Sequence, residues 1–327
     1  MPEHTPVLEL SHVSVAYRTA AGPVQAVNDV SLVVMPNEIV GLVGESGSGK
    51  STMAYAIMRL LRGNAYVSGG SIRVLGRDVY AMGRQELRKF RWRHMSMVFQ
   101  SAMSALNPVI TVETQLVDTL RSHLPNMSVS EAKDRAANLL ELVRIDPVNL
   151  KSYPHQLSGG MRQRVVIAIA IALEPELVIM DEPTTALDVV VQRSILDRLQ
   201  EIQADKRFSV LFISHDFSLV SELSSRMAIM YAGRIVEEAP ASSLSSIEGH
   251  HPYTEGLLRA IPKLTADEIT IKGIKGHPPD LVDLPVGCAF HPRCPRAYEP
   301  CRLFRPEILA TESGRVECHL FAEKEVL

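Results

Sequence analysis

The chain has 327 residues, of which 34 are basic and 37 acidic, so its formal charge is −3. This length can bury a sizeable core, and a near-neutral charge without a concentrated basic face argues against a nucleic-acid partner. No apolar run approaches the length that spans a bilayer, and Glu174 ends the longest candidate, residues 165–173. Because the N-terminus lacks the basic-then-apolar pattern of a signal peptide, we expect a cytosolic chain without a membrane domain of its own.

A glycine-rich loop follows the first strongly apolar segment. Residues 39–43 are typical of a buried strand, and residues 51–61 are rich in helix formers. Residues 44–51 between them read Gly-Glu-Ser-Gly-Ser-Gly-Lys-Ser, a complete phosphate loop in the required strand–loop–helix context. Its glycines let backbone N–H groups turn toward phosphate oxygens, and they are Gly44, Gly47 and Gly49. The loop predicts a nucleotide site, where Lys50 would reach the β- and γ-phosphates and Ser51 would ligate Mg²⁺. By itself it fits many nucleotide-binding proteins, including kinases and GTPases.

A helical segment is expected from residue 101 to about residue 160. Ser128 and Glu131 match a capping box, the pattern in which two side chains satisfy the open N–H groups of a helix start. Five apolar residues then share one helical face, and they are Ala132, Ala136, Leu139, Leu140 and Val143. This segment interrupts the α/β pattern, which resumes afterwards and continues to about residue 240.

A second anion site is predicted at the end of this segment. Ser158, Gly159 and Gly160 precede a long apolar stretch, residues 165–173, which is typical of a buried helix. A serine and two glycines at a helix start present a hydroxyl and open backbone N–H groups to a negatively charged ligand. An ordinary capped helix is the alternative.

Two adjacent carboxylates stand at the end of the next apolar strand. Residues 177–180 deliver Asp181 and Glu182 at the carboxyl end of that strand, where doubly wound sheets place their ligands. The two acids need not share a role. Asp181 would hold Mg²⁺, and Glu182 would polarise the attacking water as a general base.

Together these segments resemble the ATP-binding cassette (ABC) ATPases. The run Leu-Ser-Gly-Gly-Met at residues 157–161 is similar to the signature that separates this family from other phosphate-loop enzymes. The resemblance implies that the signature faces the γ-phosphate bound by another subunit, so function requires a dimer. The implied fold is α/β: an ABC-type P-loop NTPase core with an antiparallel β subdomain and a helical subdomain (about 101–160), all within a nucleotide-binding domain over residues 1–250.

Four further positions match the family. Gln100 resembles the Q-loop glutamine, which contacts Mg²⁺ or the water and senses the membrane partner. His215 resembles the switch histidine near the γ-phosphate, and residues 186–188, ending in Asp188, resemble the D-loop across the dimer interface. Tyr17 stands where the family stacks an aromatic ring on adenine. Loop residues that the resemblance adds to the nucleotide contacts are Ser46 and Thr52.

All four cysteines lie in the last part of the chain, at Cys288, Cys294, Cys301 and Cys318. Such clustering suggests a shared ligand, because a cytosolic chain has little reason to keep disulfides. Four thiols can ligate a 4Fe-4S cluster or a tetrahedral Zn²⁺, and the spacing lacks the paired C-x2-C knuckles common in zinc sites. His291 and His319 stand beside cysteines and could substitute in a zinc site. The spacing also resembles the cluster-bearing tail of peptide-importer ATPases, and this resemblance implies a 4Fe-4S cluster with a structural role. Zn²⁺ and unliganded or disulfide-bonded cysteines are the alternatives.

The C-terminal part of the chain also indicates which group of ABC ATPases the sequence resembles. The runs His-Pro-Tyr-Thr at 251–254 and His-Pro-Arg-Cys-Pro at 291–295 resemble the C-terminal extension of dipeptide and oligopeptide importer ATPases, here residues 251–327. Related nickel and oligosaccharide importers carry similar tails. The extension therefore implies import, and it favours a peptide as the solute.

The resemblance implies an ATPase that powers solute import from the cytoplasmic face of the cell membrane, as a peripheral subunit. Its implied partners are a second ABC ATPase subunit (a related but different chain), two transmembrane permease subunits and an extracytoplasmic solute-binding protein. Importers of nickel or oligosaccharides are the nearest alternative. An ABC ATPase acting on DNA or ribosomes is disfavoured, because no long coiled coil interrupts the cassette and only one cassette is present. A non-catalytic regulatory cassette is disfavoured because Lys50, Glu182 and His215 are all present.

Overall fold

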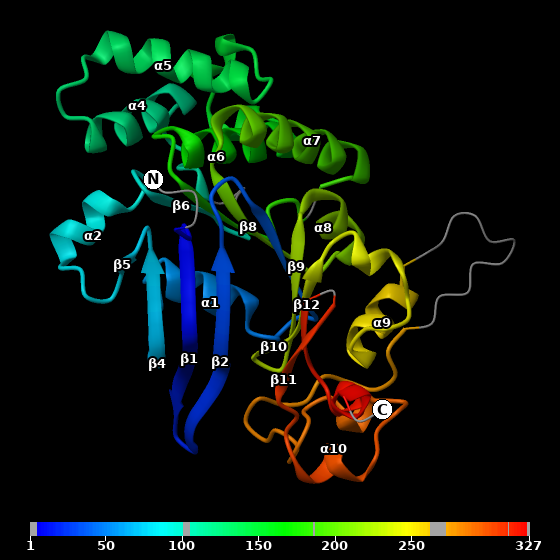
Figure 1. Cartoon of the computed structure of the whole chain (residues 1–327). Coiled ribbons are helices and arrows are strands. Elements are labelled where there is room, and N and C mark those ends of the chain that lie inside the picture. Colours follow the sequence, from blue (N-terminus) through cyan, green and yellow to red (C-terminus); the bar gives the residue numbers. More distant parts are fainter. Residues whose placement is uncertain (1–4, 101–104, 186, 262–272, 313, 326–327) are drawn as a thin grey trace, which may run out of the picture. The chain divides into compact units, whose positions relative to one another are not determined.

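The computed structural model describes residues 5–100, 105–185, 187–261, 273–312 and 314–325. The chain forms two compact units, and Figure 1 shows its helices and strands. The first unit comprises residues 1–8, 33–38 and 73–211, and the second comprises residues 9–32, 39–72 and 212–327. Within the described ranges, no helix is both long enough and apolar enough to cross a bilayer.

Among the described residues, the first unit contains five α-helices and three complete strands. Its strands are β5 (Arg77–Asp78), β6 (Met95–Val98) and β7 (Leu177–Asp181), and its helices are α2 (Arg84–Phe90), α4 (Val112–His123), α5 (Val129–Leu142), α6 (Gly159–Ile171) and α7 (Val189–Lys206), with 3₁₀ turns η1 (Pro147–Lys151) and η2 (Pro154–Gln156). β6 and β7 pair in parallel, with Met95 opposite Leu177 and Val98 opposite Met180. Both strands are entirely buried, as expected for continuous apolar strands of a parallel sheet.

Local sequence signals explain where the helices of this unit begin. The capping box is confirmed: Ser128 Oγ accepts from the Glu131 N–H at 3.2 Å, and the Glu131 carboxylate accepts from the Ser128 N–H at 2.8 Å. All five apolar residues predicted for the inner face of α5 and its end are buried. α4, α5 and α6 contact one another, so the predicted helical segment forms a small cluster of its own within the first unit.

The second unit contains most of the strands. Its elements are β1 (Leu8–Thr19), β2 (Gly22–Val34), β3 (Ile39–Val43), β4 (Ala65–Val74), β9 (Arg226–Tyr231), β10 (Arg234–Pro240), β11 (Ile308–Thr311) and β12 (Gly314–Glu317), with helices α1 (Lys50–Ile57), α8 (Phe217–Leu223), α9 (Pro252–Arg259) and α10 (Glu299–Leu303) and 3₁₀ turns η3 (Ser243–Ser245), η4 (His291–Arg293) and η5 (His319–Glu325). β1, β2 and β4 lie mainly here, and β8 (Ser209–Ser214) is divided between the units.

The predicted strand and helix bounds around the phosphate loop need one correction. The strand is confirmed as β3, but the helix ends at Ile57, four residues before the predicted end at residue 61. Arg59 takes a left-handed conformation, with φ of +52°, which an α-helix cannot contain. Helix-forming side chains alone did not reveal this stop.

The C-terminal extension is built onto the strands of the second unit. β3 and β9 are parallel, β9 and β10 form a hairpin, and β12 pairs antiparallel with β10, with Glu238 opposite Arg315 (Figure 1). β11 then pairs with β12. Because an open strand edge would leave unpaired N–H and C=O groups, the β11–β12 hairpin completes the edge of β10. The strand that precedes Cys318, β12, is therefore joined through β10 and β9 to β3, the strand that leads into the phosphate loop.

Buried ion pairs reinforce this attachment. The Arg234 Nε lies 2.9 Å from both carboxylate oxygens of Glu317, and Arg305 reaches the same carboxylate at 3.0 Å. Glu238 is bonded by both Arg226 and Arg315. Carboxylates this deeply buried persist only with charged partners, so these contacts fix the register of the extension.

Candidate functional site

The predicted nucleotide-site residues fall into two groups, one in each compact unit. The second unit carries Tyr17, Gly44, Ser46, Gly47, Gly49, Lys50, Ser51, Thr52 and His215. The first unit carries Gln100, Ser158, Gly159, Gly160, Asp181, Glu182 and Asp188.

The phosphate loop joins β3 to α1 within the second unit. Gly49 is the N-cap of α1 with φ of +104°, and a Cβ at this position would stand 2.2 Å from the carbonyl oxygen of Ala26. Both the backbone conformation and the space therefore require glycine. Ser46 and Gly47 are exposed in the loop, and Ser51 follows in the first turn of α1. The loop thus has the backbone geometry expected of a phosphate site at a helix N-terminus.

Lys50 is held by the loop itself. Its side chain is buried, and the ammonium group donates to the carbonyl oxygens of Gly44 at 2.7 Å and Glu45 at 2.8 Å. A third contact, to Ser48 Oγ, is 3.3 Å long. These contacts place the positive charge against the loop backbone, where a phosphate group would need it.

Two more predicted site residues belong to the second unit. The Tyr17 hydroxyl lies 3.1 Å from Thr52 Oγ1, so the predicted adenine-stacking ring stands beside α1. His215 is exposed between the end of β8 and the N-cap of α8, Asp216, whose carboxylate accepts from the Leu219 N–H at 3.1 Å.

In the first unit, the structure brings Gln100 and Glu182 together. Gln100 Nε2 donates to Glu182 Oε2 at 3.0 Å, and Thr185 Oγ1 donates to the same oxygen at 3.0 Å. Glu182 has a φ of +46°, an uncommon conformation for a residue with a Cβ, directly after the fully buried Asp181. The side chain that we expect to polarise water is therefore oriented by two neutral donors.

Ser158 stands at the start of a helix, as predicted, and whether this start binds an anion stays a prediction. Ser158 is the N-cap of α6, and its Oγ accepts from the Met161 N–H at 3.2 Å. Gly159 and Gly160 form the first turn, and a Cβ on Gly160 would lie 2.6 Å from Val191 Cγ1 at the start of α7. Because Gly160 has no side chain, the starts of α6 and α7 can approach closely.

The start of α7 shows a feature that the sequence analysis missed. Asp188 is its N-cap, accepting from the Val191 N–H at 2.9 Å, while Ala186 lies outside the described residues. The next two residues, Val189 and Val190, are 80% and 79% exposed. In the sequence, only their position directly after the predicted D-loop could have identified these two valines as interface candidates.

The cysteines do not form a recognisable metal site. All four are free thiols, with Cys301 and Cys318 buried and the other two half-buried. Burial, reinforced by the neighbouring thiols, raises the pKa of Cys288 to about 11 and that of Cys318 to about 12. Throughout the described part of the chain, no three His, Cys, Asp or Glu side chains are placed to hold a metal ion. The structure thus shows neither the predicted 4Fe-4S cluster nor the alternative Zn²⁺, and both stay predictions.

The extension also contacts the phosphate loop, which the sequence did not reveal. The Arg293 guanidinium forms two hydrogen bonds with the Glu45 carboxylate, at 2.6 and 2.9 Å, across 248 residues of chain. The Glu45 N–H donates to the Tyr253 hydroxyl at 2.8 Å. Arg293 belongs to a run that the tail resemblance includes, but no sequence signal assigned it a partner.

Two family profiles match this chain. The one described as "ABC transporter" matches residues 27–185, and the one described as "Oligopeptide/dipeptide transporter, C-terminal region" matches residues 236–301.

Curated relatives match over nearly the whole length. A putative peptide import ATP-binding protein of Brucella melitensis is 45% identical over 312 residues, which cover 95% of this chain and 93% of the relative. The oligopeptide transport ATP-binding protein AppD of Bacillus subtilis is 41% identical, covering 97% of this chain and 98% of the relative. Among solved structures, the post-hydrolysis dimer of the ATP-binding cassette MJ0796 with ADP and Pi covers 72% of this chain and 98% of its own, with a TM-score of 0.65 and 27% identity.

Proposed function

This chain belongs to the ATP-binding proteins of ABC transporters, in the group with the oligopeptide and dipeptide transporter C-terminal region, and on that premise we propose that it powers the import of di- or oligopeptides. It is an ATPase. The observation that carries the proposal is the presence of both the cassette and the importer-type C-terminal region in one chain, matched over almost its full length by peptide import proteins.

The proposed roles follow from the chemistry of each side chain. Lys50 binds the terminal phosphates of ATP as a point charge, and Glu182 polarises the attacking water. Ser51 and the buried Asp181 supply a hydroxyl and a carboxylate, the oxygen ligands that Mg²⁺ prefers, and the ion neutralises phosphate charge when bound. His215 acts near the γ-phosphate.

The hydrogen bond between Gln100 and Glu182 supports a coupled role for that pair. Because Gln100 holds one oxygen of the catalytic carboxylate, a shift of the Q-loop would change the orientation of the general base. The remaining nucleotide contacts that we propose are Tyr17, Gly44, Ser46, Gly47, Gly49 and Thr52.

We propose that a second cassette completes the ATP site. The signature residues Ser158, Gly159 and Gly160 would face the nucleotide of that partner, and Asp188 would lie across the interface. Val189 and Val190 support this proposal, because two strongly exposed apolar side chains beside the predicted interface indicate a surface that another chain covers. The partner cassette is proposed to be a related but different chain.

Membrane permease subunits and an external solute-binding protein are the other partners expected of a peptide importer ATPase. The helical segment of the first unit carries exposed apolar side chains suited to a membrane partner, among them Val109 at 75% and Val148 at 70% exposure. We propose that two permease subunits bind this chain at the cytoplasmic face of the membrane.

For the cysteines, a 4Fe-4S cluster remains a proposal. Its support is that the four thiols lie in one short stretch of the sequence, from residue 288 to residue 318. In addition, the Cys288 N–H donates to the Cys301 carbonyl at 2.9 Å, which brings those two residues side by side.

The nucleotide-binding domain is proposed to cover residues 1–250 and the extension residues 251–327.

The test is reconstitution. The chain is combined with its permease and partner cassette in proteoliposomes, with the solute-binding protein on the outside, and ATP-dependent uptake is measured for labelled peptides, Ni²⁺ and oligosaccharides. Uptake of peptides, abolished by Lys50→Ala, supports the proposal. ATP-driven uptake of Ni²⁺ or an oligosaccharide alone would replace the solute and keep the importer mechanism.

A further inference from the structure

Glu45 is an acidic residue inside a loop that we propose binds a polyanion. Its own carbonyl oxygen accepts from the Lys50 ammonium at 2.8 Å, so the residue is an integral part of the phosphate loop. A free carboxylate at this position would repel the phosphates of ATP. The loop therefore needs either a different residue at position 45 or a partner that neutralises the charge.

Arg293 supplies that partner from the extension. Its guanidinium meets the carboxylate in the bidentate geometry that pairs two N–H groups with two oxygens, at 2.6 and 2.9 Å. The arginine side chain is only 5% exposed, whereas that of Glu45 is 28% exposed. Further contacts hold the guanidinium in place: Nε donates to the Lys275 carbonyl at 3.1 Å, and the ring of Tyr231 lies 5.8 Å away. The charge is thus fixed in position before any ligand binds.

Tyr253 fixes the backbone of the same loop residue. Its hydroxyl accepts the Glu45 N–H at 2.8 Å, and its ring is fully buried against Tyr231 and Phe290, with centroids 4.6 and 5.4 Å apart. A side chain in such a packed aromatic cluster has few alternative rotamers. The loop residue is therefore held at its N–H and at its carboxylate by two rigid groups of the extension.

We propose that Arg293 and Tyr253 are positioning residues for ATP, through which the cysteine-containing extension keeps the phosphate loop competent to bind. Arg293 neutralises Glu45, and Tyr253 orients its backbone. This inference rests on the proposed ATP site. It makes nucleotide affinity depend on an extension whose sequence lies more than two hundred residues away from the loop.

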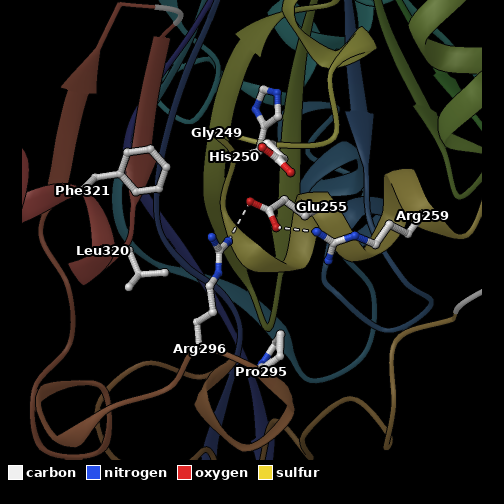
Figure 2. A pocket seen from close by; sticks show the side chains of 9 residues that line it. Gly249, His250, Glu255, Arg259, Pro295, Arg296, Leu320 and Phe321 are labelled. Carbon is white, nitrogen blue, oxygen red and sulfur yellow. Dashed lines mark hydrogen bonds and ion pairs between the residues drawn. The ribbon is translucent and has the colours of Figure 1, made fainter.

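A neighbouring ion pair provides a matched control. Arg296, three residues after Arg293, binds the Glu255 carboxylate at 2.7 Å, and Arg259 binds its other oxygen at 3.1 Å. Figure 2 shows Glu255 between these two guanidinium groups, in a pocket that includes no residue of the phosphate loop. Arg296→Gln therefore removes an arginine pair from the same segment without changing the charge at the loop.

The experiment measures the equilibrium affinity of the full-length chain for ATP, by displacement of a fluorescent ATP analogue. Arg293→Gln is expected to raise the Kd about tenfold at low salt, and less at high salt, because screening weakens the repulsion from the half-buried Glu45. The double variant Glu45→Gln with Arg293→Gln is expected to recover to within about threefold of the wild type. Tyr253→Phe, which keeps the ring but removes the acceptor, is expected to raise the Kd about threefold.

Recovery of ATP affinity in the double variant distinguishes neutralisation of Glu45 by Arg293 from a purely structural role of Arg293 in attaching the extension. If Arg293 only held the extension in place, the double variant would bind ATP no better than Arg293→Gln, and that result would overturn the inference. An equal loss in Arg296→Gln would overturn it as well. Should Arg293→Gln fail to fold, Arg293→Lys replaces it, because lysine keeps the positive charge without the two-pronged guanidinium group. This variant is expected to keep the ATP affinity within about threefold. A tenfold loss of affinity in Arg293→Lys would count against neutralisation. A wild-type chain that binds ATP no better than Lys50→Ala would instead refute the proposed ATP site.

Discussion

Replacing Glu182 with Gln tests the proposed general base without removing its hydrogen-bond partners. The amide oxygen can still accept from Gln100 and Thr185, each now 3.0 Å from Glu182 Oε2, so the local fold is retained. Two hydrogen bonds to a charged acceptor become neutral ones, a cost of about 1 kcal/mol each against a stability of roughly 5–15 kcal/mol. The variant is therefore expected to fold.

Turnover is expected to change far more than stability. A positioned base contributes about 10²- to 10⁴-fold, which corresponds to about 2.7–5.4 kcal/mol of activation free energy. ATP binding should be unchanged within about twofold, because the phosphate loop is untouched, and the proposed pairing with a second cassette should persist with nucleotide bound. Phosphate release by the reconstituted complex gives the rate, and displacement of a fluorescent ATP analogue gives the affinity. A rate within tenfold of the wild type would refute the role of Glu182, and a matching loss of affinity would point to a binding role instead.

Three further outcomes are expected. Gly160→Val forces a Cβ to within 2.6 Å of Val191 Cγ1, so hydrolysis should fall about 10²-fold while ATP binding to the isolated chain is preserved; parallel losses would indicate misfolding. The hydrogen bond to Glu237, 2.6 Å long, raises the pKa of His250, so its stabilising effect is complete below about pH 6.5 and is lost as the pH rises through the raised value. His250→Gln should accordingly lower the Tm by about 3 °C at pH 6 and by less at pH 9, and a pH-independent difference would contradict this sign. Anaerobically purified protein should contain about four irons per chain and lose its broad visible absorption in Cys294→Ser, whereas colourless protein with one zinc would contradict the cluster.

Short-range patterns predicted the individual elements of the site well. The phosphate loop between β3 and α1, the helix start at Ser158 and the carboxylates at the end of β7 all depend on residues within a few positions of one another. A cap or a glycine turn is decided by local backbone conformation, and a buried strand by a continuous apolar run. The fold class and the family therefore followed from the sequence, although the end of α1 did not.

Longer-range pairings were not predictable in the same way. The distance of 82 residues between Gln100 and Glu182 carries no sign that one donates to the other, although the family resemblance had given both a role at the ATP site. The cysteine spacing likewise left cluster, zinc and free thiols open, because ligation depends on where four loop positions meet in space.

The sequence by itself determined a phosphate-binding cassette with an importer-type extension, since each defining motif is local and chemically specific. Only the tertiary structure decided that the extension reaches the phosphate loop, through the pairing of β12 with β10 and the contact of Arg293 with Glu45. The physical reason is that local conformation is set by neighbouring residues. The partner of a buried charge, by contrast, is set by the chain topology that brings distant segments together.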